Sequence, residues 1–254
     1  MTEMATYQSI LAYDGTAFAG FQRQRGRRTV QGELEKSLRK LGWRERAVRA
    51  AGRTDSGVHA SGQVVAYELN WRGDTERLTR ALNAQLPDDM AVSATSAAAA
   101  GFQPRYAARW RRYRYRIIVA PQRLPLQERF AWRIWPAPGL VPMQTAAREL
   151  LGEHDFGAFG TAPRRGSHTR RIVRRAEWLM EGEGASFLIE GDAFLYRMVR
   201  RLTAALVAIG QGRAPASSVS AHLAEPNGKW HGSPAPAHGL CLEAVIFEDG
   251  RVDD

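Results

Sequence analysis

Two hydrophobic periods alternate along this chain of 254 residues, and that alternation constrains its fold more than any other feature. Apolar or β-branched side chains at every second position predict strands, whereas apolar side chains three and four positions apart predict helices. The two kinds of segment follow one another from end to end. The pattern therefore predicts an α/β (α+β) fold of mixed or antiparallel sheets backed by helices.

The predicted strands are short runs bounded by turn residues. They cover residues 8–13, 46–51, 63–69, 90–97, 112–119, 171–180, 186–190 and 240–247. The runs 171–180 and 186–190 form a predicted hairpin around Gly182 and Gly184.

Five segments have a helical period: 30–41, 75–86, 143–151, 194–209 and 217–224. Thr29 is positioned to cap the first helix and Gly42 to end it. The segment 194–209 carries the clearest apolar stripe, formed by Phe194, Met198, Leu202, Leu206 and Ile209.

Residues 97–101 are small and form a predicted hinge. This hinge separates an N-terminal α/β half, residues 1–100, from a C-terminal α/β half, residues 101–254. Each half mixes strands and helices in a similar rhythm, although no repeat is visible in the sequence.

The chain is strongly basic, with a formal net charge of +10 and a pI of about 10.4. Only three of its 36 basic residues are lysines, and genomic base composition explains that ratio better than function does. It does not explain the net charge. Excess positive charge favours a polyanionic partner such as a nucleic acid.

Cys241 is the only cysteine, which rules out an internal disulfide or a thiolate zinc site and fits a reducing compartment. We found no signal-peptide pattern, and no apolar run approaches the ~18 residues of a membrane span. These observations predict a cytoplasmic protein with no membrane partner. The six histidines form no metal pattern and no phosphate-binding glycine motif occurs, so neither a metal nor a cofactor is expected.

Asp55 lies in a connection between two predicted strands, within the segment A-G-R-T-D-S-G-V-H-A at 51–60. Gly52 and Gly57 permit close backbone approach or a positive φ. Arg53 shares a side with Asp55 in an extended stretch, and a carboxylate beside a guanidinium stays ionised, as a nucleophile or base requires. The alternative is an ordinary turn in which the aspartate bonds its own backbone.

The segment 105–116 contains six arginines. Alternation within its strand places Arg112, Arg114 and Arg116 on one face and Tyr113, Tyr115 and Ile117 on the other. The arginine row suits phosphates, with a solvated strand face as the alternative. The tyrosines either pack the core, which we expect for Tyr115, or stack on a base.

Two further groups have competing interpretations. Arg197, Arg200 and Arg201 form a basic patch beside the apolar stripe of the helix 194–209, which is typical of a solvated face. His154 and Asp155 are adjacent, as in metal-dependent phosphohydrolases, but no second His-Asp pair accompanies them.

The string R-T-D-S-G-V-H at 53–59, with Gln63, resembles the active-site signature of the tRNA pseudouridine synthase A family. Other matches to that family follow along nearly the whole chain. They are Y-D-G-T-x-F-x-G-F-Q at 13–22, R-Y-R-Y at 112–115, L-L-G-E-H-D-F at 150–156, M-V-R at 198–200 and G-L-x-L-x-x-V at 239–245.

The resemblance implies roles for individual residues. Asp55 is the catalytic residue, Arg200 reaches it, and Tyr113 lines the active site against the target base. Leu240 forms an apolar wall beside the uracil. The other residues expected to bind the substrate are Arg53, Arg112, Arg114 and Gln22.

The resemblance also implies the pseudouridine synthase fold and the isomerisation of uridine to pseudouridine in the anticodon stem-loop of tRNA, at positions 38, 39 and 40. The N-terminal half carries the catalytic aspartate and the C-terminal half completes the active-site cleft. The family needs no cofactor or metal and works as a homodimer. A non-catalytic basic RNA-binding protein and a metal phosphohydrolase are the alternatives.

Departures from the family pattern are mild. Phe21 replaces a tryptophan, Gln103 a common histidine, Ala204 a helical glycine and Cys241 a tyrosine. None of them removes a catalytic group, so they affect only the expected detail of the RNA contacts.

Overall fold

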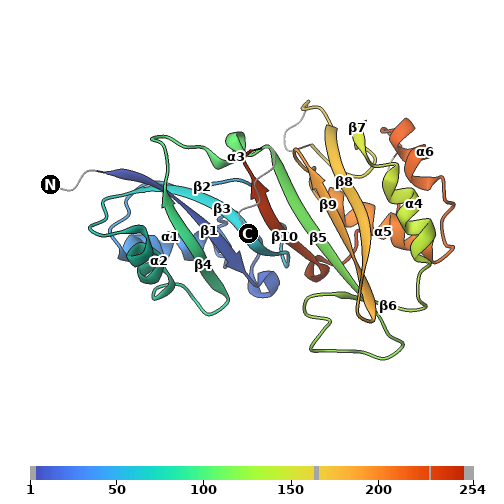
Figure 1. The fold of residues 1–254 in the computed structure, drawn as a ribbon, viewed down its shortest axis with the longest axis horizontal. Helices are drawn as coiled ribbons and strands as arrows, with labels where there is room; N and C mark the ends of the chain where they lie inside the picture. Colours follow the sequence, from blue (N-terminus) through green and yellow to red (C-terminus); the bar gives the residue numbers. More distant parts are fainter. Residues whose placement is uncertain (1–3, 163–165, 229, 249–254) are drawn as a thin grey trace. The chain divides into compact units, whose positions relative to one another are not determined.

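The computed structural model of the chain describes residues 4–162, 166–228 and 230–248. They divide into two compact units, Met1–Arg109 with Leu242–Asp254, and Trp110–Cys241. In each unit a mostly antiparallel sheet is backed by helices (Figure 1), which confirms the predicted fold class. The functional division into residues 1–100 and 101–254 stays a prediction.

The sheet of the first unit has the strand order β4-β1-β3-β10, with β2 pairing β3. Its strands are β1 (Ala5–Tyr13), β2 (Arg49–Ala50), β3 (His59–Leu69), β4 (Met90–Ala97) and β10 (Leu240–Ile246), of which Leu240 and Cys241 are assigned to the second unit. β1 is antiparallel to both β3 and β4. β10 lies so close to β3 that a Cβ added at Gly62 would be 2.0 Å from the carbonyl oxygen of Glu243.

Helical segments of the first unit are η1 (Gly15–Ala17), α1 (Val30–Lys40), α2 (Thr75–Asn83) and α3 (Pro104–Ala107). The predicted cap of α1 is confirmed, because the Thr29 hydroxyl accepts a hydrogen bond from the Gly32 amide at 3.3 Å. Its apolar stripe is buried through Leu34 and Leu38.

In the second unit the strand order is β5-β9-β8-β7, and β6 runs parallel to β5. The strands are β5 (Trp110–Val119), β6 (Trp132–Ile134), β7 (Gly152–Asp155), β8 (Arg170–Glu181) and β9 (Gly184–Gly191). β8 and β9 form the predicted hairpin. Its helical segments are α4 (Leu140–Arg148), α5 (Met198–Gly210), α6 (Ser218–Ala224) and η2 (Ala237–Gly239).

Some predicted boundaries were wrong. The strand predicted over 46–51 is reduced to β2, and the helix predicted over 194–209 begins only at Met198. Arg197 precedes it with a φ of 62°, in the left-handed region that a right-handed helix cannot continue through. Arg197 therefore does not share a helical face with Arg200 and Arg201, and the predicted three-arginine patch on one helix is incorrect.

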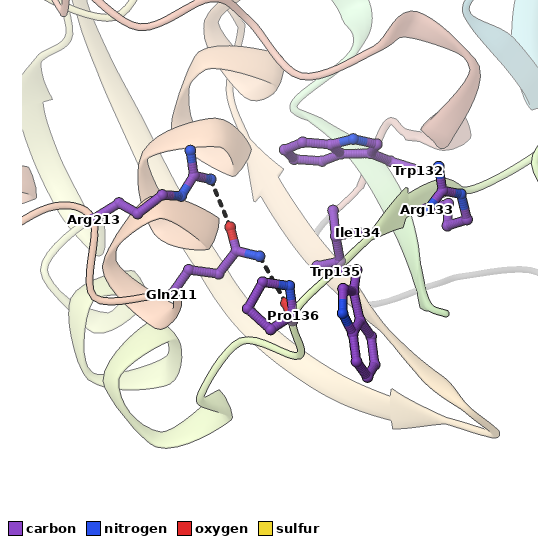
Figure 2. Close-up of a pocket in the computed structure, with 7 residues that line it drawn as sticks. All are labelled: Trp132, Arg133, Ile134, Trp135, Pro136, Gln211 and Arg213. Atoms are coloured by element: carbon purple, nitrogen blue, oxygen red, sulfur yellow. Dashed lines mark hydrogen bonds between the residues drawn. The ribbon is translucent and has the colours of Figure 1, made fainter. Parts of the chain in front are cut away.

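A surface cavity of about 530 Å³ opens in the second unit (Figure 2). Gln211 spans part of it, donating to the carbonyl oxygen of Pro136 at 2.7 Å and accepting from Arg213 at 2.6 Å. Its lining consists of Trp132, Arg133, Ile134, Trp135, Pro136, Gln211 and Arg213. This lining includes none of the predicted site residues.

Within the described ranges, the helices are all too short or too polar to cross a membrane.

Candidate active site

Asp55 lies in the loop between β2 and β3, and its neighbour Thr54 fixes that loop from two directions. The Thr54 carbonyl accepts from the Phe21 amide at 3.0 Å. The Thr54 hydroxyl lies 2.8 Å from the hydroxyl of Tyr13, at the end of β1. Thr54 is buried whereas Asp55 is half-buried, so the loop is anchored through Thr54 and leaves Asp55 partly accessible.

A second set of contacts ties the loop to the residues around η1. The Phe18 carbonyl accepts from the Gly57 amide at 3.3 Å and from the Ser56 hydroxyl at 3.2 Å. Gly57 has a φ of 79°, as its type allows, and a Cβ added at Gly15 would lie 2.1 Å from the Val58 carbonyl oxygen. The loop and η1 therefore form one tightly packed backbone structure.

Gly52 does not play the part that the sequence suggested. It has no positive φ, and a Cβ added there would meet nothing within 4 Å. Its contribution is a carbonyl oxygen, which accepts from the Gln63 side-chain amide at 3.0 Å.

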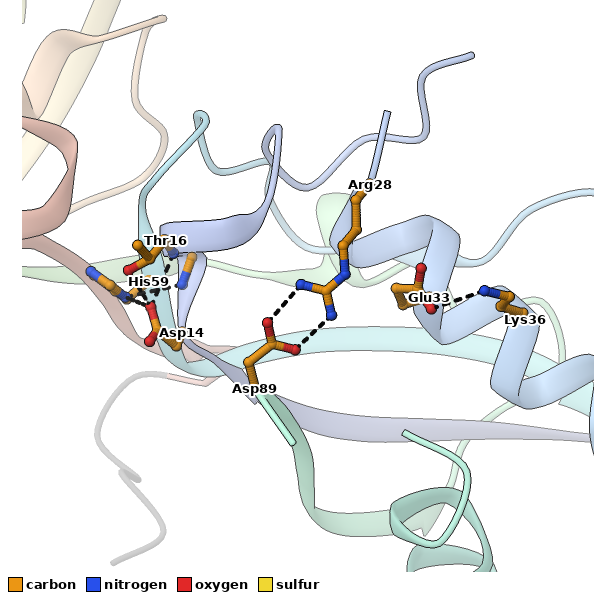
Figure 3. Close-up of polar contacts among 8 residues, drawn as sticks. Asp14, Thr16, Arg28, Glu33, Lys36, His59 and Asp89 are labelled. Atoms are coloured by element: carbon orange, nitrogen blue, oxygen red, sulfur yellow. Dashed lines mark hydrogen bonds and ion pairs between the residues drawn. The ribbon is translucent and has the colours of Figure 1, made fainter. Parts of the chain in front are cut away.

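His59 supports the same region through η1, where it lies beside Asp14 and Thr16 (Figure 3). It is buried, and its Nδ1 accepts from the Gly15 amide at 3.0 Å. Asp14 Oδ1 lies 3.2 Å from that nitrogen and accepts from both the amide and the hydroxyl of Thr16. The signature histidine thus anchors η1, which in turn holds the Asp55 loop.

Gln22 and Arg53, the other predicted site residues of the first unit, are both exposed. Gln22 follows Phe21, whose amide bonds the loop, and Arg53 precedes Thr54. The first unit therefore brings Gln22, Arg53 and Asp55 together on one hydrogen-bonded framework.

The remaining predicted site residues belong to the second unit: Arg112, Tyr113, Arg114, Arg200 and Leu240. Tyr113 is largely buried in β5, and its ring contacts Phe194 edge-on with centroids 5.2 Å apart. Tyr115 is fully buried, as expected, and donates to the Pro236 carbonyl at 2.8 Å.

Arg200, on α5, is half-buried and held by the turn that precedes β10. Its Nε donates to the Ala235 carbonyl at 2.7 Å, and its own carbonyl accepts from the Ala235 amide at 3.0 Å. The same turn presses Gly239 against the ring of Tyr115 and leads into Leu240, which is buried. One turn thus positions Arg200 and Leu240.

This turn also contains a histidine whose titration is perturbed. Burial lowers the pKa of His238, Glu128 opposes that shift, and the positive charge of Arg200 adds to it. Burial also raises the pKa of Tyr115 well above its ordinary value, while Arg200 acts in the opposite direction. The positive charge of Arg200 therefore acts to lower the pKa of both His238 and Tyr115.

Glutamates partly neutralise the predicted arginine row. Arg112 pairs with Glu190 at 2.9 Å, and that carboxylate is almost fully buried. Arg114 pairs with Glu181 and also donates to the Ser186 hydroxyl at 3.0 Å. The alternation along β5 is as predicted, but these arginines carry less free charge than the sequence suggests.

His154 and Asp155 are engaged by nearby groups. Asp155 Oδ1 accepts from the Gly157 amide at 2.9 Å and from Thr169, and His154 Nε2 lies 2.8 Å from the Leu151 carbonyl oxygen. Among the residues that the structure describes, no group of three or more histidine, cysteine, aspartate and glutamate side chains is placed to hold a metal ion.

Sequence reasoning missed the residues that support the site. Tyr13 and Phe18 hold the Asp55 loop from about 40 positions away, and the turn at 235–239 holds Arg200 from the far end of its own unit. Tyr13 lies within a motif that resembles the family, which was the one available signal for its importance.

Comparison with known proteins identifies the family. The sequence model described as tRNA pseudouridine synthase matches residues 10–107 and 146–248. A tRNA pseudouridine synthase A from Shouchella clausii (strain KSM-K16) is 42% identical over 238 residues, which cover 93% of this chain and 91% of the relative. Its namesake from Myxococcus xanthus is 40% identical over 97% of this chain and 94% of its own length. The chain therefore belongs to the tRNA pseudouridine synthase family of isomerases.

Proposed function

We propose that this protein converts uridine to pseudouridine in the anticodon stem-loop of tRNA, at positions 38, 39 and 40, with Asp55 as its catalytic residue. The observation that carries the proposal is the display of Asp55 on a loop fixed through Thr54, Phe18 and Gly57. A catalytic group needs such preorganisation because small displacements cost large factors in rate. The resemblance of the loop to the family signature supplies the choice of reaction and position.

The isomerisation changes no atom count. The bond between N1 of the uracil and C1′ of the ribose breaks, the base turns, and C5 bonds to C1′. The proton leaves C5 and one is gained at N1, so no oxidant or phosphoryl donor is required. Three roles for Asp55 fit this balance: attack on C1′, attack on C6, or removal of a proton from the sugar.

The other site residues have proposed parts in the same reaction. Tyr113 contacts the flipped uracil and takes part in proton transfer, Leu240 bounds the base, and Arg200 provides the positive charge that orients Asp55. Four polar residues are proposed to bind the RNA: Gln22, Arg53, Arg112 and Arg114. Phosphates must compete with Glu190 and Glu181 for the last two.

Incubation with unmodified tRNA transcripts, followed by mapping of pseudouridine, tests the proposal. We expect Asp55→Asn to abolish product while RNA binding persists, because the amide keeps the shape but lacks the nucleophilic and basic carboxylate. Asp88→Asn is the matched control, since Asp88 is an exposed carboxylate of the same unit. Product from Asp55→Asn at more than a small fraction of the normal rate would refute the assignment. RNA binding without product from the unaltered protein would support a non-catalytic RNA-binding protein.

We also infer from the family resemblance that the protein acts as a homodimer in the cytoplasm. Sedimentation of the purified protein would test the first inference, with a mass near twice 28.2 kDa as the expected result. Localisation of a fluorescent fusion would test the second.

A further inference from the structure

The loop between η1 and α1, residues 22–28, is exposed throughout and reads Q-R-Q-R-G-R-R. It contains four arginines and no acidic residue. It also adjoins Phe21, whose amide bonds the Asp55 loop at Thr54. The start of this loop is thus tied to the Asp55 loop within the first unit.

Two of the four arginines hold the ends of this loop in place. Arg23 pairs with the fully buried Glu35 and donates to the Arg46 carbonyl. Arg28 forms a bidentate pair with Asp89, at 2.6 and 2.8 Å (Figure 3), and lies over the ring of Phe18. The hydrogen bond to Asp89 raises the pKa of Arg28. Both guanidinium groups are therefore already engaged in contacts that hold the loop.

The middle of the loop is a defined turn. The Arg27 amide donates to the Gln24 carbonyl at 3.4 Å, and Gly26 supplies a φ of 71°, as a type II turn requires at this position. The Gln24 side chain donates to the Ala19 carbonyl at 2.8 Å, and the Ala19 amide donates to the Arg28 carbonyl at 2.8 Å. These bonds limit the conformations of the turn without using any arginine side chain.

Arg25 and Arg27 flank this turn. Within the described part of the chain, neither guanidinium has an ion pair or hydrogen bond, in contrast to Arg23 and Arg28. A guanidinium with free donors on an ordered backbone suits a phosphate, because it offers a bidentate fork and the loop loses little entropy on binding.

We propose that Arg25 and Arg27 bind backbone phosphates of the tRNA strand next to the target uridine, and that Arg23 and Arg28 position the turn that presents them. This inference rests on the proposed function for the identity of the RNA. It concerns RNA binding and not the chemical step. An experiment can therefore refute this inference without refuting the proposed function, and the reverse.

The test measures the affinity of the full-length protein for an unmodified tRNA transcript at several salt concentrations. We expect Arg25→Ala and Arg27→Ala each to reduce the log–log salt slope by about 0.7–0.9, and the double variant by about twice that. Their KM for the transcript should rise while the maximal rate is unchanged. Arg44→Ala is the matched control, because Arg44 is an exposed arginine beyond the other end of α1, and its slope should stay close to that of the unaltered protein.

Charge-retaining variants separate contact from loop damage. Arg25→Lys and Arg27→Lys should keep most of the salt slope, since the charge remains. The inference would be overturned if the salt slopes of Arg25→Ala and Arg27→Ala equalled the salt slope of Arg44→Ala. It would also be overturned if the two alanine variants lowered the maximal rate and left the salt slope unaltered. If the unaltered protein bound tRNA with these slopes but made no pseudouridine, the proposed function would fail, whereas phosphate binding by Arg25 and Arg27 would stand.

Discussion

At the scale of single residues, buried partners set the behaviour of the polar groups in each unit. Arg200 is held by two hydrogen bonds to Ala235, and its charge reaches His238 and Tyr115. His59, which belongs to the recognised signature, serves the backbone of Gly15. The signature therefore contains, beside the candidate catalytic Asp55, a residue that supports the backbone of the unit.

The position of Arg200 predicts the titration of His238. Because burial and Arg200 both lower its pKa, we expect the imidazole to titrate below 6.5 in the folded protein. Arg200→Ala should raise this pKa and Glu128→Gln should lower it further, whereas the neighbouring Arg201→Ala should leave it unchanged. NMR titration of the His238 ring checks all three.

The lowered pKa of His238 also makes the stability of the protein depend on pH. The unfolded chain binds a proton at His238 at a higher pH than the folded chain, so folding favours the neutral ring. The stability that this residue contributes is complete above pH 6.5 and is lost as the pH falls from 6.5 through the lower folded pKa. In the Arg200→Ala variant the pKa of His238 in the folded protein should lie closer to 6.5. Urea unfolding experiments should therefore show this loss of stability over a narrower pH range.

Tyr113→Phe tests whether the tyrosine has a chemical part or only a packing part. The phenylalanine ring keeps its contact with Phe194, so stacking on a base, worth about 1–3 kcal/mol, should persist. Loss of the hydroxyl should slow proton transfer by about 100-fold or more in single-turnover experiments. A variant that reacts at full rate would limit Tyr113 to stacking.

At the scale of elements, the packing of η1 against the Asp55 loop leaves no room for an added methyl group at Gly15. We expect Gly15→Ala to destabilise the protein by about 1–3 kcal/mol and to lower its activity, because the new methyl group would displace Val58. Gly52→Ala is the control within the same loop and should be nearly neutral. Urea unfolding and initial rates measure both effects, and equal effects of the two substitutions would contradict this account.

The sequence predicted most elements because their periods and end signals are local. α1 is an example, since its cap Thr29 and its stripe lie within about a dozen residues. The start of α5 could not be predicted, because Leu195 continues the helical period yet packs on Gly160, and the Tyr196 amide bonds the Thr161 carbonyl. Strands of two to four residues, such as β6 and β7, are too short to show a period.

Candidate residues of the site were predictable for a different reason. Asp55 stands out through its local turn chemistry and its resemblance to a family signature. The partners of Arg112 and Arg114 could not be predicted, because Glu190 and Glu181 reach them only through the pairing of β5 with β9 and of β9 with β8.

At the scale of the whole molecule, the first unit is assembled from two distant parts of the chain. Residues 1–109 are completed by β10, whose Leu242 and Ile246 are buried. Each such side chain contributes about 1.5–3 kcal/mol. We expect a fragment of residues 1–109 to be less stable in urea than the same fragment linked to residues 240–248, and Leu242→Asp in the linked form should remove most of the gain. Equal stability of all three would show that β10 is dispensable for this unit.

The discontinuity of the first unit has a consequence for biosynthesis. Residues 110–241 follow one another without interruption, so the second unit can fold as it leaves the ribosome. The first unit, although it is synthesised earlier, must wait roughly 7–26 s for that stretch to be translated at 5–20 residues per second. Its sheet lacks a strand during this time, with the edge of β3 uncovered beside Gly62. The nascent chain thus gains its complete Asp55-bearing unit only after translation has passed residue 246.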